Sequence, residues 1–454
     1  MLGWGDAEVP LIMACVFLAA HNRIRCLHPF SCMPKLLPFK KAALSLVLAS
    51  LPVSAFAYQT VTISKGDIGE PFLLQTSYER IGGWQDFMTS RSRVVALSRH
   101  GQAIRVIEKQ RYDLAADHVL ATIPIRSETA HTLKVDFNAG FDRIFLEEDR
   151  TGEDYNGRHT KEDYSFVGLT NRRMLNVSHD GKMLVIDQEG LDKYSNRVLV
   201  HYYLTPYHQN SEFKPFEIEN LEHFGFYETY PVRQSGKTVL YAMKFDPGKP
   251  IIFALSSAIP AQYREAVRDG VLYWNKAFGF SLLEVIDAPE GVTAPDPEYN
   301  VIQWVAKERR NSTSHIQSDP FTGEVLHASI FICSRFMEEG DLSEQNDQLR
   351  YIVAHEVGHA LGLRHNFAKG PVSTVMNYFS FKRAVQIGND VIESGKEALD
   401  YDRQVIRFVY LDEPLDLDTL PAFCTGYQAR CKPFTRVSAR QRALEDIAAE
   451  SRAD

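Results

Sequence analysis

The chain has 454 residues, of which 44% are hydrophobic and 24% charged, so it is long and apolar enough to bury more than one core. Its formal net charge is −8 at pH 7, and its basic residues do not gather into runs. This distribution argues against a surface that follows a nucleic-acid backbone, and we expect no nucleic-acid partner.

The first 57 residues are predicted to be absent from the mature protein. Residues 33–57 combine a lysine-containing start, an apolar run and the small-x-small site Ala55-Phe56-Ala57, which is the pattern of a secretory signal peptide. Residues 1–32 are interpreted as an over-extended start. The apolar run is shorter than the roughly 20 residues that a membrane span requires, so we expect no stable span after cleavage and a periplasmic or secreted protein. The alternative is an uncleaved N-terminal anchor.

Residues 58–235 are predicted to form a β-rich N-terminal domain. Short runs rich in aliphatic and β-branched residues alternate here with turn residues, at 94–97, 104–107, 119–124, 133–137, 183–186 and 198–204. The first two runs flank His100-Gly101 and predict a hairpin. The runs have no fixed period, which argues against a repeat array.

Residues 249–410 alternate predicted strands with predicted helices. Apolar runs predict strands at 251–255, 282–286, 301–305 and 328–332. Apolar residues at three-and-four spacing predict one helix that begins at Pro260 and runs through Phe278, and a second over 349–361. We expect the run at 328–332 to be the sheet edge on which an extended peptide lies. Residues 411–454 are interpreted as a C-terminal extension.

The second predicted helix carries His355-Glu356-Val357-Gly358-His359. Residues four apart share one face of a helix, so His355 and His359 can bind the same metal ion. Glu356 then lies beside the metal, where it can act as a general base on bound water. Gly362 can take a left-handed conformation that ends the helix and lets His365 return as third ligand. Three neutral imidazoles leave one position open, which is typical of catalytic zinc.

The full motif is more specific than its first half. His-Glu-x-x-His alone occurs by chance in roughly one chain in a hundred of this length, and the added Gly362 and His365 lower that by about a thousandfold. The alternative is an amphipathic helix with incidental histidines. The chain resembles the metzincin clan of zinc peptidases, whose extended motif it matches at all five defining positions.

The metzincin resemblance also concerns a turn downstream of the motif. Residues 373–378, Ser-Thr-Val-Met-Asn-Tyr, lie at a suitable distance for the methionine turn that the clan places beneath its metal. Tyr378, two residues after Met376, resembles the tyrosine of the astacin and serralysin branches. The resemblance implies that this phenol can approach the zinc or the oxyanion. Simple core packing is the alternative for both side chains.

A closer resemblance is to a bacterial family of exported, zinc-dependent metzincin-like proteases that place a β-rich domain before the peptidase domain. Segments 273–278, 299–305, 319–325 and 363–367 carry this likeness. It implies an α+β fold: a metzincin-like zinc peptidase domain, with a twisted mixed sheet and an active-site helix, preceded by a β-rich domain. It also implies an endopeptidase with a protein or peptide substrate. The chain differs from many members of that family in being shorter at its C-terminus.

Two other functions fit the same motif. One is a zinc hydrolase that acts on a non-protein amide, and the other is a binding protein that retains zinc without catalysis. The intact Glu356 argues against the second.

Three cysteines remain after the predicted cleavage. Cys424 and Cys431, with six residues between them, are the natural disulfide pair in an oxidising compartment. The alternative is that both are reduced. Cys333 is expected to be a small buried residue and not a nucleophile.

Overall fold

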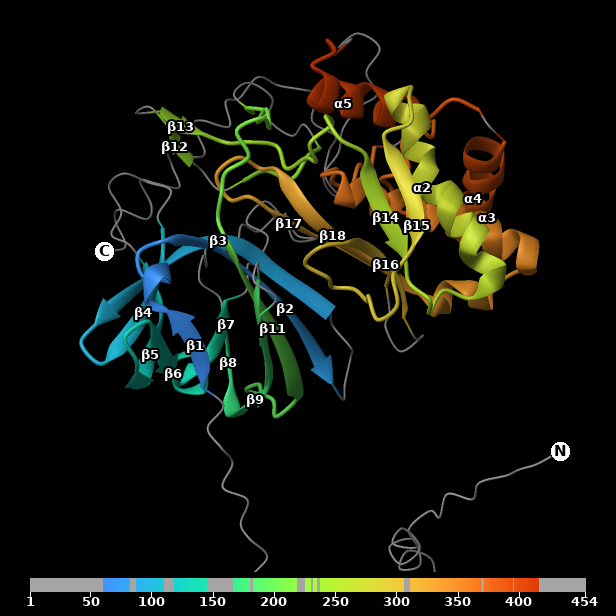
Figure 1. The fold of residues 1–454 in the computed structure, drawn as a ribbon. Coiled ribbons are helices and arrows are strands. Elements are labelled where there is room, and N and C mark those ends of the chain that lie inside the picture. The colour runs from blue at the N-terminus through green and yellow to red at the C-terminus, as the bar shows by residue number, and fades with distance from the viewer. Residues whose placement is uncertain are drawn as a thin grey trace, which may run out of the picture. The chain divides into compact units, whose positions relative to one another are not determined.

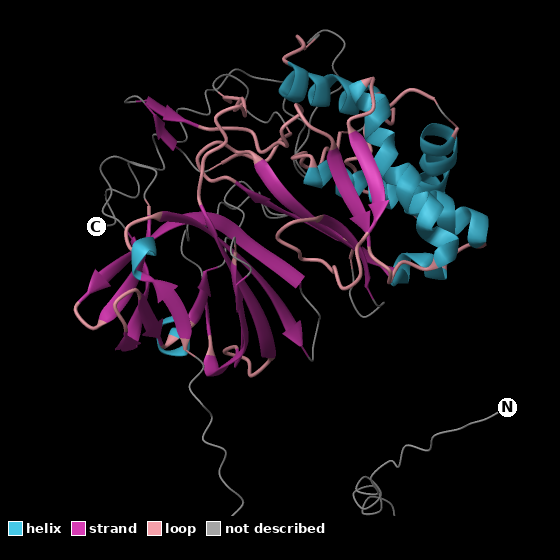
Figure 2. Cartoon of the chain, viewed as in Figure 1, coloured by secondary structure: helices cyan, strands magenta, loops and turns pink. Residues whose placement is uncertain are grey.

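The computed structural model describes residues 60–415, except 82–86, 110–117, 146–165, 180–182, 219–224, 230–231, 235–236, 306–310, 369–370 and 395. The predicted over-extended start and signal peptide, most of the C-terminal extension, and Cys424 with Cys431 lie outside the described residues. The described residues belong to one compact unit. It contains both sheets and helices, as the α+β prediction requires (Figure 2).

The first half of this unit is a nine-stranded antiparallel sheet (Figure 1). Its strands are β1 (Val61–Ser64), β2 (Pro71–Ile81), β3 (Phe87–His100), β4 (Ala103–Glu108), β5 (His118–Glu128), β6 (Thr132–Val135), β9 (Thr170–His179), β10 (Leu184–Leu191) and β11 (Arg197–Pro206). They follow the order β1-β6-β5-β4-β3-β2-β11-β10-β9. The predicted hairpin is present, because β3 and β4 pair up to His100 and Ala103. A separate pair joins β7 (Arg143–Phe145) to β8 (Phe166–Gly168).

One face of the nine-stranded sheet holds its hydrophobic core. Along β4 every second residue is buried, including Ile104 and Val106, as a half-buried strand requires. Val198, Val200 and Tyr202 of β11 join the same core. Two short helical turns, η1 (Lys65–Asp67) and α1 (Phe137–Gly140), accompany this sheet. The proposed boundaries 58–235 and 249–410 stay predictions.

The second half contains a five-stranded mixed sheet of order β15-β14-β16-β18-β17. Its strands are β14 (Ile251–Leu255), β15 (Leu283–Asp287), β16 (Asn300–Val305), β17 (Thr313–Ser318) and β18 (Val325–Cys333). Only β17 runs antiparallel to its neighbour. A short strand pair, β12 (Val232–Gln234) and β13 (Lys237–Val239), comes before this sheet in the chain.

The expectation that residues 328–332 form the sheet edge is wrong. They lie in β18, which has β16 on one side and β17 on the other. The outer strands are β15 and β17, and the sequence analysis did not predict β17. β18 is a nearly continuous apolar run, which is typical of a strand buried on both faces. β17 reads Thr-Ser-His-Ile-Gln-Ser, and a single aliphatic residue gives no strand signal.

Two helices pack against one face of the mixed sheet (Figures 1 and 2). A short turn, η2 (Ala261–Tyr263), leads into α2 (Arg264–Phe278), and α3 (Leu342–Ala360) follows the turn η3 (Ser334–Glu338). The chain then forms α4 (Phe381–Ile387), the π-helical η4 (Gly388–Glu393) and α5 (Asp400–Leu411). Among the described residues, no helix is long and apolar enough to cross a membrane.

Candidate metal centre

Helix α3 carries the first two histidines of the motif at its buried end. The helix begins at a capping box in which Asp341 and Glu344 bond each other's backbone N–H groups. At the other end, His355, Glu356 and His359 are only 5%, 6% and 7% exposed. A long, capped helix with a buried end holds these three side chains in a defined geometry.

Gly362 ends the motif helix in the way that the sequence analysis predicted. Its φ is +98°, in the left-handed region, and a Cβ at this position would lie 2.0 Å from the carbonyl oxygen of Met243. Both facts exclude a larger residue. The chain reverses here, and His365 returns toward the two helical histidines, with its ring centroid 4.6 Å from that of His359.

The three imidazoles form a group that fits one metal ion. Their candidate ligand atoms all lie within 4.8 Å of one another. The Nε2 atoms of His359 and His365 are 3.1 Å apart. A tetrahedral zinc with Zn–N bonds of about 2.0–2.1 Å would separate two ligand nitrogens by about 3.3 Å. Within the part of the chain that the structure describes, this is the only such group of His, Cys, Asp or Glu side chains.

Backbone carbonyls orient two of the rings. Nδ1 of His355 is 2.8 Å from the carbonyl oxygen of Val375, and Nδ1 of His359 is 2.7 Å from that of Leu363. Each Nδ1 can therefore carry the proton and donate it to the carbonyl. That tautomer leaves the Nε2 lone pair for a metal.

Burial keeps the imidazoles of His355 and His365 neutral. Burial and, to a smaller extent, the neighbouring His359 lower the pKa of His355 to about 3. Burial also lowers the pKa of His365, with smaller contributions from His359 and His355. Unprotonated rings are the form that binds zinc, so the donor set suits the metal at neutral pH.

The methionine turn lies against the motif helix. Met376 is fully buried, and a Cβ on Gly358 would lie 2.3 Å from its sulfur and 2.7 Å from the ring of Trp274. Gly358 stands between His355 and His359 in sequence, so the sulfur packs directly behind the histidine pair. The backbone N–H of Asn366 donates to the carbonyl of Met376 at 2.7 Å, which ties the turn to the residue after His365.

A buried carboxyl group from α5 anchors this turn. Asp402 accepts hydrogen bonds from the hydroxyl of Thr374, from the backbone N–H of Val375 at 2.9 Å and from the hydroxyl of Tyr273 at 2.8 Å. Burial raises the pKa of Asp402 to about 7, against the lowering effect of these three donors. Because the Val375 carbonyl faces His355, Asp402 supports the ligand through the turn.

Tyr378 lies beside the histidines at the surface. Its ring centroid is 4.4 Å from that of His365 and 5.5 Å from that of His355, and the residue is 42% exposed. Phe367 packs on the same side, 5.5 Å from Tyr378. The phenol is therefore close to the metal site, and its predicted role at the reaction centre stays a prediction.

Sequence reasoning missed Tyr227. Its hydroxyl oxygen is 3.5 Å from Nδ1 of His359, and the two ring centroids are 6.1 Å apart. The residue precedes the predicted peptidase region and lies 132 positions from His359. A lone tyrosine at that separation carries no local signal.

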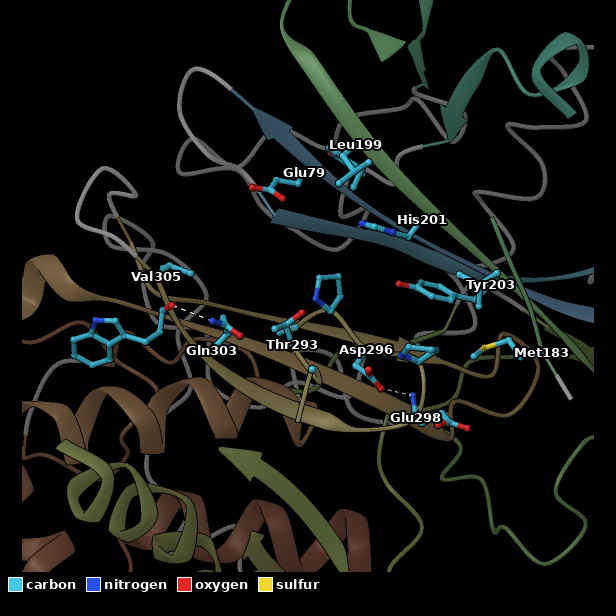
Figure 3. Close-up of a pocket in the computed structure, with 17 residues that line it drawn as sticks. Glu79, Met183, Leu199, His201, Tyr203, Thr293, Asp296, Glu298, Gln303 and Val305 are labelled. Carbon is cyan, nitrogen blue, oxygen red and sulfur yellow. Dashed lines mark hydrogen bonds between the residues drawn. The ribbon is translucent and has the colours of Figure 1, made fainter. Parts of the chain in front are cut away.

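The structure also contains a cavity of about 710 Å³, which Figure 3 shows with its lining residues. Side chains of the nine-stranded sheet, including Glu79, His201 and Tyr203, line it together with Asp296 and Glu298. Burial raises the pKa of Glu79 and of Asp296. His201 is paired with Asp187 at 2.7 Å. None of the three motif histidines lines this cavity.

Comparison with known families supports the interpretation of the three histidines as a zinc site. A family model described as Met-zincin matches residues 339–416, which include α3, the three histidines and the methionine turn. The metzincin resemblance is thereby confirmed for this segment, and the match and the histidine group together support the predicted zinc cofactor. No curated protein matches the chain, and no solved structure does.

Proposed function

We propose that the protein is a zinc-dependent endopeptidase that is exported to the periplasm or the medium. The observation that carries this proposal is the convergence of His355, His359 and His365 in the segment matched by the Met-zincin model. Glu356, one residue after the first ligand on the same helix, supplies the carboxylate that peptide hydrolysis requires. The predicted signal peptide supports export.

Two side chains of the protein, Glu356 and Tyr378, would take part in the hydrolysis beside the metal. When bound, zinc supplies a Lewis acid that polarises a carbonyl and lowers the pKa of water. Glu356 takes the proton of the attacking water and returns it to the leaving amine. Tyr378 donates its phenolic proton as a hydrogen bond toward the developing oxyanion.

The outer strand β17 replaces residues 328–332 as the proposed guide for the substrate. It is the last strand of the mixed sheet. An extended peptide that adds to such an edge gains backbone hydrogen bonds without needing a particular sequence. This arrangement supports a general protein or peptide substrate over a small amide.

The direct test compares casein cleavage by wild-type protein and the Glu356→Gln variant, both loaded with zinc. Glutamine keeps the size of the side chain but cannot take a proton, so we expect a loss of at least about a hundredfold in turnover. The Glu265→Gln variant removes the same charge from an exposed position on α2 and should keep full turnover. Near-normal cleavage by Glu356→Gln would exclude the proposed base.

The same assay separates the alternatives. A zinc-loaded wild-type protein that leaves casein intact but hydrolyses small amides would be a non-peptidase hydrolase. A protein that binds zinc and hydrolyses neither would be a binding protein.

A further inference from the structure

We propose that Tyr227 is a positioning residue of the zinc site, and that residues 225–228 act as an added strand that holds the turn between His359 and His365. This inference rests on the zinc site and not on peptidase activity. The segment lies outside the residues matched by the Met-zincin model, 339–416, and before the predicted peptidase region.

Backbone hydrogen bonds fasten this segment to the turn. The N–H of Tyr227 donates to the carbonyl of Gly362, and the N–H of Arg364 donates to the carbonyl of Gly225, both at 2.7 Å. Phe226 and Leu363 form an antiparallel bridge between these two bonds. The turn that returns the third histidine is therefore paired with a neighbouring strand on both sides of Leu363.

The segment is in turn tied to the start of the mixed-sheet region. The N–H of Met243 donates to the carbonyl of Tyr227 at 2.8 Å. The carbonyl of Met243 is the atom that a Cβ on Gly362 would strike. The tight turn at Gly362 thus packs against a backbone layer made of 225–228 and Met243.

Side chains add a second set of contacts. The guanidinium of Arg364 lies over the ring of Tyr227, 5.6 Å from its centroid, and is 3.9 Å from the carboxylate of Glu228. Both charged side chains are largely buried, at 17% and 14% exposed. Arg364 directly precedes His365, so its fixed position limits where the third ligand can point.

The hydroxyl of Tyr227 acts on the second ligand. The Leu363 carbonyl is the closer acceptor for Nδ1–H of His359, at 2.7 Å, and the Tyr227 oxygen is a longer one at 3.5 Å. Two acceptors on one side of the ring resist its rotation and favour the tautomer that offers Nε2 to a metal. Partners of this kind typically contribute 10- to 100-fold, roughly, to metal affinity.

This assignment sets a limit on N-terminal processing. A chain shortened to begin after residue 228 would lack the strand that pairs with Gly362 and Arg364. Any removal of the β-rich region that preserves the metal site must therefore leave residues 225–228 in place.

The test measures the zinc dissociation constant of the full mature protein by competition with a chromophoric chelator, without substrate. We expect Tyr227→Phe to raise the constant at least about threefold and Tyr227→Ala about 10- to 100-fold, the range found for groups that orient metal ligands. The metal-free Tyr227→Phe protein should melt within about a degree of wild type, since its ring and backbone pairing remain.

Tyr263→Phe is the matched control. The hydroxyl of Tyr263 donates to Gln345 at 2.7 Å, and Gln345 lies in α3 at the end away from the histidines. Loss of this hydrogen bond should make the variant melt earlier but leave its zinc affinity unchanged. A Tyr227→Phe protein with wild-type zinc affinity would overturn the proposal, whether or not Tyr227→Ala folds. Equal weakening of zinc binding in Tyr263→Phe would also overturn it. Because no substrate is used, failure here is distinct from failure of the peptidase assignment.

Discussion

His355 and His359, the two histidines of helix α3, differ from ordinary surface histidines because a backbone carbonyl holds the Nδ1 atom of each ring. Both rings face backbone carbonyls, one from the methionine turn and one from the helix end. Carbonyls of folded turns cannot move independently, so the ring orientation depends on the turns. The site is thus only as rigid as the residues that fix Val375 and Leu363.

Asp402 fixes the first of these turns, and its titration provides a prediction. Its pKa is about 7 in the fold against an ordinary value of 3.8, so between these values the unfolded chain has lost a proton that the folded chain keeps. Deprotonation then favours unfolding, and stability falls as the pH rises from about 4 to about 7, by at most about 1.4 kcal/mol per pH unit. Asp402→Asn removes this dependence.

Urea unfolding of the metal-free proteins at pH 5 and pH 8 checks the prediction for Asp402. The stability of wild type relative to Asp402→Asn should be lower at pH 8 than at pH 5. A difference that stays constant over this range would show that the carboxyl does not titrate as its burial implies.

Of the residues that make up the metal site, the sequence predicts those whose relative positions helix geometry determines. The spacing of His355, Glu356 and His359 suffices because residues on a helix have defined relative positions. Asp402 and Tyr227 contribute through tertiary contacts, and neither has a neighbour in sequence that signals this. Their roles required the fold.

After residue 249, apolar runs predict four of the five strands of the mixed sheet, and three-and-four spacing predicts α2 and the second part of α3, but β17, α4 and α5 are not predicted. β17 has one aliphatic residue, whereas β18 is an apolar run interrupted only by His327 and Ser329. Which strand lies at the edge depends on pairing between distant segments, which local patterns do not encode. The error at residues 328–332 follows from this.

The turn at Gly362 should be among the least tolerant positions. Gly362→Ala would force a left-handed backbone, at a cost of roughly 1–2 kcal/mol, and also a clash with the Met243 carbonyl. We expect a lower melting temperature and weaker zinc binding. Gly291→Ala is the matched control, because Gly291 has φ +84° but nothing within 4 Å of an added Cβ. Equal effects of the two substitutions on melting and on zinc binding would contradict this account of the turn.

For the whole molecule, export is the prediction that decides in which compartment the protein acts. The mature protein recovered from the periplasm or medium should begin at Tyr58, because the Ala55-Phe56-Ala57 site directly follows the apolar run. N-terminal sequencing checks this. A chain that begins at Met1, or that is found only in the cytoplasm, would contradict it.

The predicted export to an oxidising compartment favours a disulfide between Cys424 and Cys431. The closed loop is short, so by chain-entropy reasoning its contribution is limited to roughly 2–3 kcal/mol, and the double Cys→Ser variant should fold but melt earlier. Cys333 is fully buried, as the sequence analysis expects. Mass spectrometry of unreduced peptides decides the matter, since free thiols at 424 and 431 would contradict the pairing.

The central claim is that His355, His359 and His365 hold one catalytic zinc, and its most direct test is the zinc content of the purified protein by elemental mass spectrometry. We predict about one zinc per chain in wild type and in His201→Ala, whose imidazole pairs with Asp187 elsewhere. His355→Ala and His359→Ala should each lose the metal. Undiminished zinc in both of these variants would contradict the account.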